Sequence, residues 1–360
     1  MKQPVPTIKD VAELTGLSVC TVSHAIHGTR HVKPETRERV LAVAEQIGYR
    51  PNRLARGLKT KRTNTVGCLV SHVRVPSVGV LVTGAEEVLV AHGYSPILSC
   101  THLQSSFELN AIRTLTDLRV DGLLAIGCSE MFVNKMAGFT EFPVVLVHCH
   151  PASATVDCVD IDDELAVKRA TEHLLSLGHR RIGFVGRASP RAMFTARRTG
   201  YSQALLSHGI PLQDRLICEI QPEPHEVRLG MTRLLSGSPR PTALVVAHAQ
   251  LSYEVVRFLR EKGIRVPDDV ALVGMGSDPW NDLVDPPLTR ISVPSLDLGR
   301  VAAELLVSRL EGRGPDSPQS VLLDAPLIVA GSCGSPMASS PSRAAGFNQD
   351  GGAFFSSGVE

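Results

Sequence analysis

The sequence predicts an α/β body of two doubly wound parallel-sheet lobes, preceded by a small all-α helix-turn-helix domain. Helix-capping residues and apolar periodicity of the helical kind fill the first 50 residues. From residue 65 onward, short continuous apolar runs alternate with amphipathic stretches. We therefore assign residues 1–50 to the helical domain, 51–62 to a linker with a marginal helix, and 63–333 to the body. The tail at 334–360 is rich in Ser, Gly and Ala, and we expect it to be disordered.

Length and composition are those of a soluble globular protein of two to three domains. The chain has 360 residues, of which 43% are hydrophobic, and a net charge of +1. No apolar run reaches the length of a membrane span, and residues 1–10 contain no apolar signal core. Eight scattered cysteines without a CxxC pair read as reduced thiols. We expect a cytoplasmic protein with no membrane partner.

The small net charge hides an uneven distribution. Residues 1–62 contain 12 Lys and Arg against 5 Asp and Glu, whereas the remainder contains 25 against 31. A basic module on a mildly acidic body indicates one polyanion-binding end. A merely solvated basic face would give the same charge, so the pattern of residues has to decide between the two interpretations.

The first expected helix begins after Thr7, which can cap it, with Asp10 placed to favour the positive helix end. Gly16 ends this helix. The apolar positions of this helix are Ile8, Val11, Ala12 and Leu14.

A second helix is expected from Ser18, as its cap, to about residue 26. Apolar side chains at helical spacing face inward, and a polar stripe at i, i+3, i+4 and i+7 faces outward. The inward residues are Leu17, Val22, Ala25 and Ile26, and the outward stripe is Cys20, Ser23, His24 and His27.

A third helix is expected to start at Pro34, since proline suits the first helical position, and to close at Gly48. Its buried stripe is predicted to be Val40, Leu41, Ala44 and Ile47. Two helices around a Gly-containing turn and a bracing third helix form the helix-turn-helix arrangement, whose second helix fits the DNA major groove. Any three-helix bundle shares this periodicity, and the positive charge is what favours nucleic acid.

Four segments within residues 7–60 resemble the amino-terminal signature of the LacI/GalR family of bacterial transcription regulators. They read TIKDVAELTGLS, TVSHAI, VKPETRERVLAVAEQIGYRPN and ARGLKT. The resemblance implies a sequence-specific DNA-binding transcription regulator, expected to be a repressor and nucleoid-associated. Its implied partners are a double-stranded, pseudo-palindromic DNA operator, a small-molecule effector, and a second copy of the chain in a homodimer or tetramer.

Residues 53–59 correspond to the hinge helix of that family, which forms only when two subunits meet on DNA. Seven residues are too few for an isolated helix, and Gly57 costs about 1 kcal/mol more than Ala. The resemblance implies that Leu58 wedges into a minor-groove step and kinks the duplex. On its own, Leu58 would read as a linker leucine packed on the body. The residues implied to meet phosphates are Arg53, Arg56 and Lys59.

Carried over by position, the residues implied to read bases are Val19, Cys20 and His24. Val19 and Cys20 are weak hydrogen-bonding residues and suit contact with thymine methyl groups, whereas His24 can donate to a purine acceptor. The implied phosphate or base-edge contacts are Thr7, Ser18, Thr21, Ser23, His31, Thr36 and Asn52.

In the body, continuous apolar runs predict buried parallel strands. They span 65–71, 95–100, 121–127, 142–148, 180–186, 242–248 and 270–276. Helices are expected over 78–92, 107–118, 165–177, 194–207, 253–262 and 296–310. Further segments, such as LLSLGHRRIGFVG and LREKGIRVPDDVALVGM, resemble the family's ligand-sensing body, which is similar to periplasmic sugar-binding proteins. Ligands of such folds lie beyond the carboxyl ends of the strands.

The expected effector site departs from the family pattern. Arg197 matches an arginine that holds ligand oxygens, but His148, His248-Ala249 and Gly276 stand where acidic or amide residues are common. His72 and His102 also follow strand-like runs. Loss of carboxylates and gain of imidazoles predict a donor-rich, cationic cleft and an anionic effector. The candidate effector-binding residues are His72, His148, Arg197 and His248.

Two alternatives remain open from the sequence. The histidines can be scattered surface residues on a body that senses no ligand and only assembles subunits. An enzymatic or metal-dependent body is less favoured, because the chain has no GxSxG elbow, no P-loop and no complete dinucleotide loop. His148 and His150 share a strand face but lack zinc-site spacing. We therefore expect no catalytic residue, no metal and no cofactor.

Overall fold

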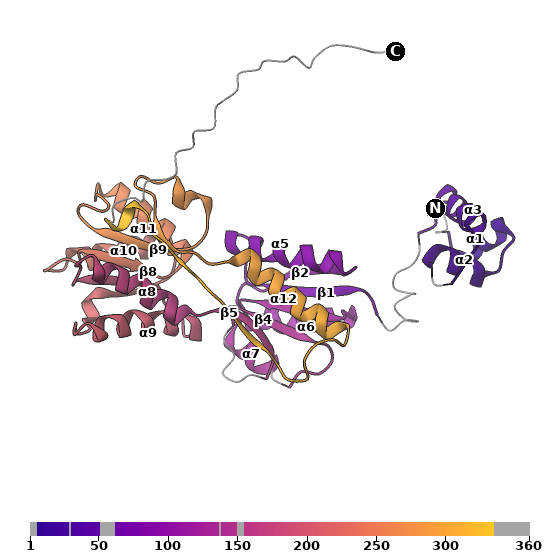
Figure 1. The fold of residues 1–360 in the computed structure, drawn as a ribbon, viewed down its shortest axis with the longest axis horizontal. Coiled ribbons are helices and arrows are strands. Elements are labelled where there is room, and N and C mark those ends of the chain that lie inside the picture. Colours follow the sequence, from indigo (N-terminus) through magenta and orange to yellow (C-terminus); the bar gives the residue numbers. More distant parts are fainter. Residues whose placement is uncertain (1–5, 29, 51–61, 137, 150–154, 335–360) are drawn as a thin grey trace, which may run out of the picture. The chain divides into compact units, whose positions relative to one another are not determined.

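The computed structural model describes residues 6–28, 30–50, 62–136, 138–149 and 155–334. The chain divides into two compact units, Met1–Thr65 and Val66–Glu360 (Figure 1). Most of the expected linker, at 51–61, lies outside the described residues, as does nearly all of the expected tail. No described helix is long and apolar enough to cross a membrane.

The first unit contains the three expected helices, α1 (Ile8–Thr15), α2 (Val19–His27) and α3 (Pro34–Gln46). The Thr7 amide and hydroxyl donate to Asp10 Oδ2 at 2.6 and 2.8 Å, which fixes the start of α1. Ser18 Oγ accepts from the Thr21 amide at 3.1 Å and caps α2. Gly16 has a φ of +68°, a left-handed conformation that glycine adopts readily, and it ends α1.

Two of the expected core positions in this unit were wrong. Leu14 is 62% exposed and Leu41 is 43% exposed. In α1 the buried stripe is narrower than predicted, and Thr15 occupies it with its hydroxyl donating to the Val11 carbonyl at 2.7 Å. In α3, Val43 packs on the core instead of Leu41. The core itself consists of Val11, Ala12, Val22, Ala25, Val40 and Ala44.

The second unit contains two largely parallel sheets, as predicted, and each has six strands. The first has the strand order β11-β5-β4-β3-β1-β2, and β1, β3, β4, β5 and β11 are paired in parallel. Its strands are β1 (Thr65–Val70), β2 (Ser95–Cys100), β3 (Gly122–Ile126), β4 (Val144–Val147), β5 (Asp157–Ile161) and β11 (Ser320–Leu323).

The second sheet has the order β12-β10-β9-β8-β6-β7, with only β12 antiparallel to its neighbour. Its strands are β6 (Ile182–Arg187), β7 (Ile217–Ile220), β8 (Ala243–Val246), β9 (Ala271–Met275), β10 (Thr289–Ile291) and β12 (Leu327–Ile328). The two sheets define two lobes.

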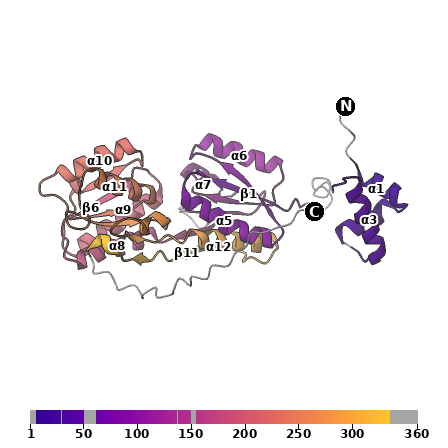
Figure 2. The same ribbon diagram turned by 90° about the horizontal axis from the view of Figure 1, so that it is seen from above.

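Helices cover the sheets. They are α5 (Pro76–Ala91), α6 (Ser105–Asp117), α7 (Glu130–Met136), α8 (Asp163–Ser176), α9 (Ala192–Ser207), α10 (Pro224–Ser236), α11 (Ala249–Glu261) and α12 (Ser295–Leu310). α8 lies against α9, and α12 lies beside α5 although more than 200 residues separate them (Figure 2). A Cβ on Gly84 would lie 2.1 Å from the Leu296 carbonyl oxygen, so only glycine permits the close approach of α5 and α12.

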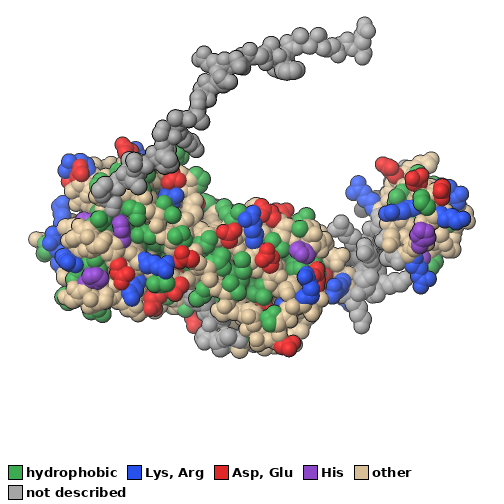
Figure 3. Space-filling view, in the orientation of Figure 1, with side chains coloured by type: hydrophobic (Ala, Val, Ile, Leu, Met, Phe, Trp, Pro, Cys, Tyr) green, Lys and Arg blue, Asp and Glu red, His purple; other side chains and the backbone are tan. Residues whose placement is uncertain are grey.

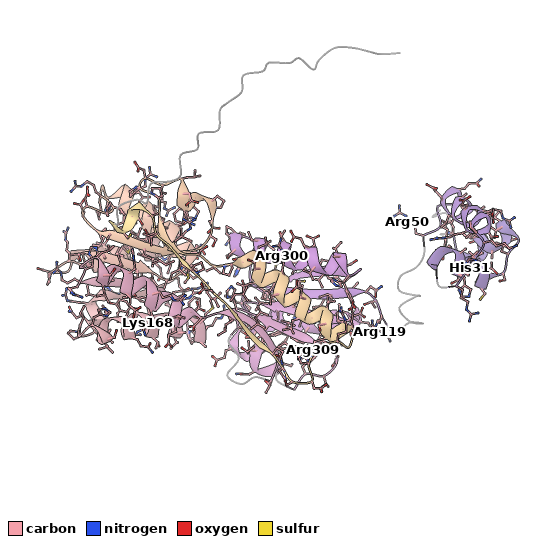
Figure 4. All side chains as sticks on the ribbon, viewed as in Figure 1. His31, Arg50, Arg119, Lys168, Arg300 and Arg309 are labelled. Carbon is pink, nitrogen blue, oxygen red and sulfur yellow. The ribbon has the colours of Figure 1, made fainter. Side chains whose placement is uncertain are left out.

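The chain passes between the lobes three times, after β5, β10 and β11. Because the chain returns to the first lobe after β10, the carboxyl-terminal α12 packs on β3, β4 and β5. From α12, Arg309 (Figure 4) donates twice to Asp157 on β5, with both distances 2.7 Å. This ion pair ties the last helix to the strand at which the chain first leaves the lobe.

The seven predicted strands and six predicted helices of the body are all present. The prediction missed α7, α10, β5, β7 and β10 to β12. β5 was missed because its sequence, DCVDI, carries two aspartates in a fully buried strand. Their partners come from distant parts of the chain, namely Arg309 for Asp157 and His148 for Asp160.

Candidate functional sites

The exposed face of α2 holds the residues that the sequence predicts to read bases. Val19 is 43% exposed, Cys20 is exposed, and His24 is half-buried. Cys20 Sγ lies 3.4 Å from His24 Nε2, one helical turn away. α2 therefore presents the short apolar side chain of Val19 and the thiol–imidazole pair of Cys20 and His24. Together they form a shallow surface that is suited to contact with base edges.

Basic side chains flank this face. Lys, Arg and His side chains are visible over the helical unit (Figure 3), and His31 follows α2 in the turn before α3 (Figure 4). A hollow of about 460 Å³ is lined by His24, Gly28, Arg30, His31, Val32 and Arg37. Sequence reasoning missed Arg30 and Arg37, although their positive charge was already counted.

Several residues that are predicted to contact phosphates also cap the amino-terminal ends of helices. The side chains of Thr7, Ser18 and Thr21 are engaged in caps, and the Ser18 and Thr21 hydroxyl oxygens lie 2.8 Å apart. Ser23 and Thr36 are half-buried. Amides at these helix starts favour a phosphate as much as the hydroxyls do. The remaining predicted contacts, Asn52, Arg53, Arg56, Leu58 and Lys59, lie outside the described residues.

A cleft in the body brings the four predicted effector residues together. His72, His148, Arg197 and His248 all line one cavity of about 150 Å³. His72, His148 and His248 follow β1, β4 and β8, so the carboxyl ends of parallel strands from both sheets meet here. His102 does not line the cavity, but its ring meets that of His72 edge-on at 5.2 Å.

Arg197 has fixed partners in this cleft. Its Nε donates to Asp163 Oδ1 at 2.6 Å and its Nη1 donates to the Ala247 carbonyl at 2.8 Å. Arg197 is 5% exposed and Asp163 is 1% exposed. No carboxylate is among the described residues that line the cavity. Behind it, however, Asp163 offsets the charge of Arg197, and Asp160 Oδ1 lies 3.1 Å from His148 Nδ1, which the sequence did not predict.

Two further arginines supply the positive charge. Arg187 at the end of β6 and Arg191 just before α9 line the cavity, and among the described residues neither has a carboxylate within ion-pairing distance. Arg191 Nη2 donates to the His148 carbonyl at 2.8 Å. The guanidinium carbons of Arg187, Arg191 and Arg197 lie 5.9, 5.9 and 5.4 Å from the centre of the Phe194 ring. Burial and the charge of Arg191 lower the pKa of Arg187.

His72 and His248 are not the source of positive charge that the sequence predicted. Burial, followed by the charges of Arg197, Arg187 and Arg191, lowers the pKa of His248 well below its usual 6.5. Burial and the neighbouring His102 lower the pKa of His72. His248 Nδ1 instead accepts from the Leu251 amide at 3.4 Å and caps α11, which requires a neutral ring nitrogen. The cleft is therefore cationic through its arginines, and the lowered pKa values of His72 and His248 favour the neutral form of these two imidazoles.

Comparison with known proteins decides the family. Residues 7–52 match the bacterial regulatory proteins of the lacI family, and residues 171–333 match a periplasmic binding protein-like domain. The chain is 31% identical over 314 residues to catabolite control protein A of Priestia megaterium, covering 86% of this chain and 94% of that protein.

The chain belongs to the lacI family of bacterial regulatory proteins. It is also 31% identical over 310 residues to the transcriptional repressor PurR of Photobacterium profundum, covering 85% of this chain and 92% of that protein. These relatives are transcriptional regulators, and lacI-family regulators bind DNA operators and small-molecule effectors. The predicted family and fold class are confirmed.

Solved structures of lacI-family regulators share the fold. A complex of the transcriptional regulator CelR with cellobiose is 29% identical with a TM-score of 0.69, covering 91% of this chain and 99% of that one. The Lac repressor dimer bound to operator and the anti-inducer ONPF has a TM-score of 0.81 at 23% identity, covering 92% of this chain and 99% of that one. At that identity the second likeness concerns the fold alone.

Sequence reasoning missed Arg187 and Arg191 in the cleft, and Asp160 and Asp163 behind it. Arg187 is the last residue of β6, Asp160 lies near the end of β5, and Asp163 is the first residue of α8. Arg187 directly follows the apolar run RRIGFVG, so the rule that ligands lie beyond strand ends would have found it. Asp160 and Asp163 had no such signal, because β5 itself was not predicted.

Proposed function

We propose that the protein is a sequence-specific repressor that binds a pseudo-palindromic operator as a dimer and is switched by a small anionic effector. The observation that carries the proposal is the arginine-lined cleft in a lacI-family body. Arg187 and Arg191 bring two positive charges to a cavity that no described carboxylate lines, and Glu223 acts on Arg187 only from beyond ion-pairing distance.

Operator reading rests on α2. Val19 and Cys20 suit thymine methyl groups, and the imidazole of His24 suits a purine acceptor. Arg30 and Arg37 lie beside them and would meet the phosphate backbone. Leu58 is proposed to wedge into the minor groove at the centre of the site, with Arg53, Arg56 and Lys59 on the flanking phosphates.

Assembly into a dimer is supported by exposed apolar side chains on the second lobe. Leu283 is 83% exposed and Tyr253 is 47% exposed. The Tyr253 ring meets the Trp280 ring edge-on at 5.6 Å, which makes a firm aromatic surface. Large aromatic and aliphatic side chains of this kind are favoured at subunit contacts. Two subunits would present two α2 helices to two half-sites.

An anionic effector follows from the charge of the cleft. Burial, the charge of Arg197 and then those of Arg187 and Arg191 lower the pKa of His248, and Arg191 also lowers the pKa of Arg187, so like charges repel one another in the cleft. A carboxylate or phosphate would relieve this repulsion and could accept from a planar guanidinium in a bidentate manner. A neutral sugar would leave the repulsion in place.

The experiment is a thermal-shift screen of the full chain with organic acids, sugar phosphates and the matching neutral sugars, followed by calorimetry. We expect stabilisation by an anion and none by its neutral analogue, with binding lost in Arg187→Gln. Arg181→Gln is the matched control, because Arg181 lies at the opposite, amino-terminal end of β6, is exposed and donates to the Arg240 carbonyl. Binding of a neutral sugar that survives Arg187→Gln contradicts the anionic effector.

A second candidate function rests on the size of the cleft. A body that senses no ligand and only joins subunits would retain DNA binding without a switch. Its support is the cavity volume of about 150 Å³, which is below the roughly 300–1,000 Å³ of ordinary ligand sites. A screen that shifts the unfolding temperature with none of the anions, sugars or metals would favour this candidate.

A further inference from the structure

Two cysteines follow neighbouring strands at equivalent positions. β3 and β4 are parallel, with Ile126 paired with Val147. Cys128 and Cys149 lie two residues beyond the members of this pair. Gly127 and His148, the residues directly after the two strands, have φ values of +65° and +56°. Because both segments bend in the same way, they stay side by side past the strand ends.

The Cys149 thiol lies against Cys128. The Cys128 amide donates to Cys149 Sγ at 3.4 Å, and each of the two side chains shifts the pKa of the other. Neighbouring strands lie about 4.7–4.9 Å apart, within the Cα separation of about 4.4–6.8 Å that a disulfide needs. Both side chains lie against the same apolar cluster. A bond between their sulfur atoms would therefore need little backbone movement.

The two cysteines differ in reactivity and access. The hydrogen bond from Cys128 and the charge of Arg191 lower the pKa of Cys149 to about 7, although burial opposes this. The bond to Cys149 and burial raise the pKa of Cys128. Cys149 is half-buried and follows the cleft residue His148, whereas Cys128 is 1% exposed. When Cys149 is a thiol, its S–H donates to the Val147 carbonyl at 3.2 Å. When it is a thiolate, its sulfur still accepts a hydrogen bond from the Cys128 amide.

We propose that Cys149 is a site of reversible oxidation by small hydroperoxides, with Cys128 as its resolving thiol. The Cys149 thiolate attacks the terminal peroxide oxygen, breaks the O–O bond and becomes a sulfenic acid, while the peroxide is reduced to water or an alcohol. Cys128 sulfur then attacks the Cys149 sulfur, and the hydroxyl leaves as water with the Cys128 proton. The disulfide is formed by loss of two electrons, both taken by the peroxide.

This proposal is independent of the identity of the effector, and it concerns a cysteine pair that the proposed regulatory function does not use. The other half-buried cysteine of the body, Cys100, serves as an internal control. The exposed Cys20 of α2 is a competing thiol, so the test uses the full chain carrying Cys20→Ser.

The reduced protein is treated with hydrogen peroxide and dimedone, and its peptides are mapped by mass spectrometry. We expect a Cys128–Cys149 disulfide that dithiothreitol reverses, and modification of Cys149 at least tenfold faster than that of Cys100. Adding Cys128→Ser should replace the disulfide by a dimedone adduct at Cys149, and adding Cys149→Ser should abolish both products. Modification of Cys100 as fast as Cys149, or oxidation of Cys149 without any disulfide in the chain that retains Cys128, would overturn the proposal.

Discussion

Arg197 Nε donates to Asp163 Oδ1 across 2.6 Å, and both side chains are almost fully buried beneath the cleft. The pair joins α9 to the first turn of α8, and Arg197 also reaches the Ala247 carbonyl at the end of β8. It therefore joins three elements that form one wall of the cleft. The contribution of this ion pair to the stability of the fold therefore has to be measured separately from any role of Arg197 in ligand binding.

Asp163→Asn should destabilise the protein by about 3–5 kcal/mol, because it leaves the buried Arg197 charge uncompensated. Urea denaturation followed by circular dichroism measures this change. The matched control is Asp324→Asn, whose partner Arg169 and whose own side chain are exposed, and it should cost less than about 1 kcal/mol. Equal losses of unfolding free energy in the two variants would show that the buried ion pair stabilises the fold no more than the exposed one does.

Acidification should weaken the fold through His248. Its folded-state pKa is lowered, so the unfolded chain binds the extra proton first as the pH falls below 6.5. Stability is therefore full above pH 6.5 and decreases below it by up to about 1.4 kcal/mol per pH unit for this one group. His248→Asn keeps a side-chain cap for α11 and should remove that share of the decrease, measured by urea denaturation at pH 5.5 and 7.5.

The control for this experiment is His225→Asn, because His225 is an exposed residue of α10. It should leave the acid sensitivity of the wild type unchanged. Burial also lowers the pKa values of His72, His173 and His179, so some acid sensitivity should remain in His248→Asn. An acid sensitivity in His248→Asn that equals that of the wild type would contradict the neutral state assigned to this imidazole.

His24→Ala should lower the ratio of specific to nonspecific DNA affinity by about 1–3 kcal/mol, which is the usual contribution of one good base contact. Fluorescence anisotropy with an operator and a scrambled duplex at one salt concentration gives this ratio. Glu13→Ala serves as a control, because Glu13 is exposed on α1 and outside the proposed reading face. An unchanged ratio in His24→Ala would show that the DNA sequence is recognised by other residues or through DNA shape.

Leu58→Ala should reduce both the bend of the operator and the affinity for it, and should spare nonspecific binding. The reason is the wedge chemistry proposed for this leucine, in which unstacking one base step allows more protein contact. A circular-permutation gel compares the bends. Leu54→Ala, a substitution in the same segment at another apolar position, tests whether any loss of a leucine has this effect. The same bend in Leu58→Ala and wild type would rule out the wedge.

The sequence was a good guide wherever one local signal decides a structure. Thr7, Ser18 and Pro34 marked the three helix starts because caps act within a single turn. The central strands were visible because strands covered on both faces are continuous apolar runs. Leu14 and Leu41 were misplaced because a two-turn stripe leaves the choice of buried positions to the neighbouring helices.

The cleft was predicted only in part, because its chemistry comes from pairings over long sequence distances. The convergence of His72, His148 and His248 followed from the rule of strand ends, whereas Arg197 followed from the family resemblance. Their charge did not follow, since Asp163 offsets Arg197 across 34 residues, and burial together with the arginines lowers the pKa of His248. Arg187 and Arg191 emerged as the charge carriers only once the geometry placed them around Phe194.

The most direct test of a repressor switched by an anion is the operator affinity of the full chain, measured by fluorescence anisotropy with a sugar phosphate and with the same sugar unphosphorylated. The operator is first selected from a random duplex library, and the pair of compounds is the one that stabilises the protein most. The account predicts that the phosphorylated compound changes the operator affinity of the wild type at least tenfold, that the neutral sugar leaves it unchanged, and that Arg187→Gln abolishes the change while keeping operator binding. Operator affinity that responds equally to both compounds, or to neither anion nor sugar, would contradict it.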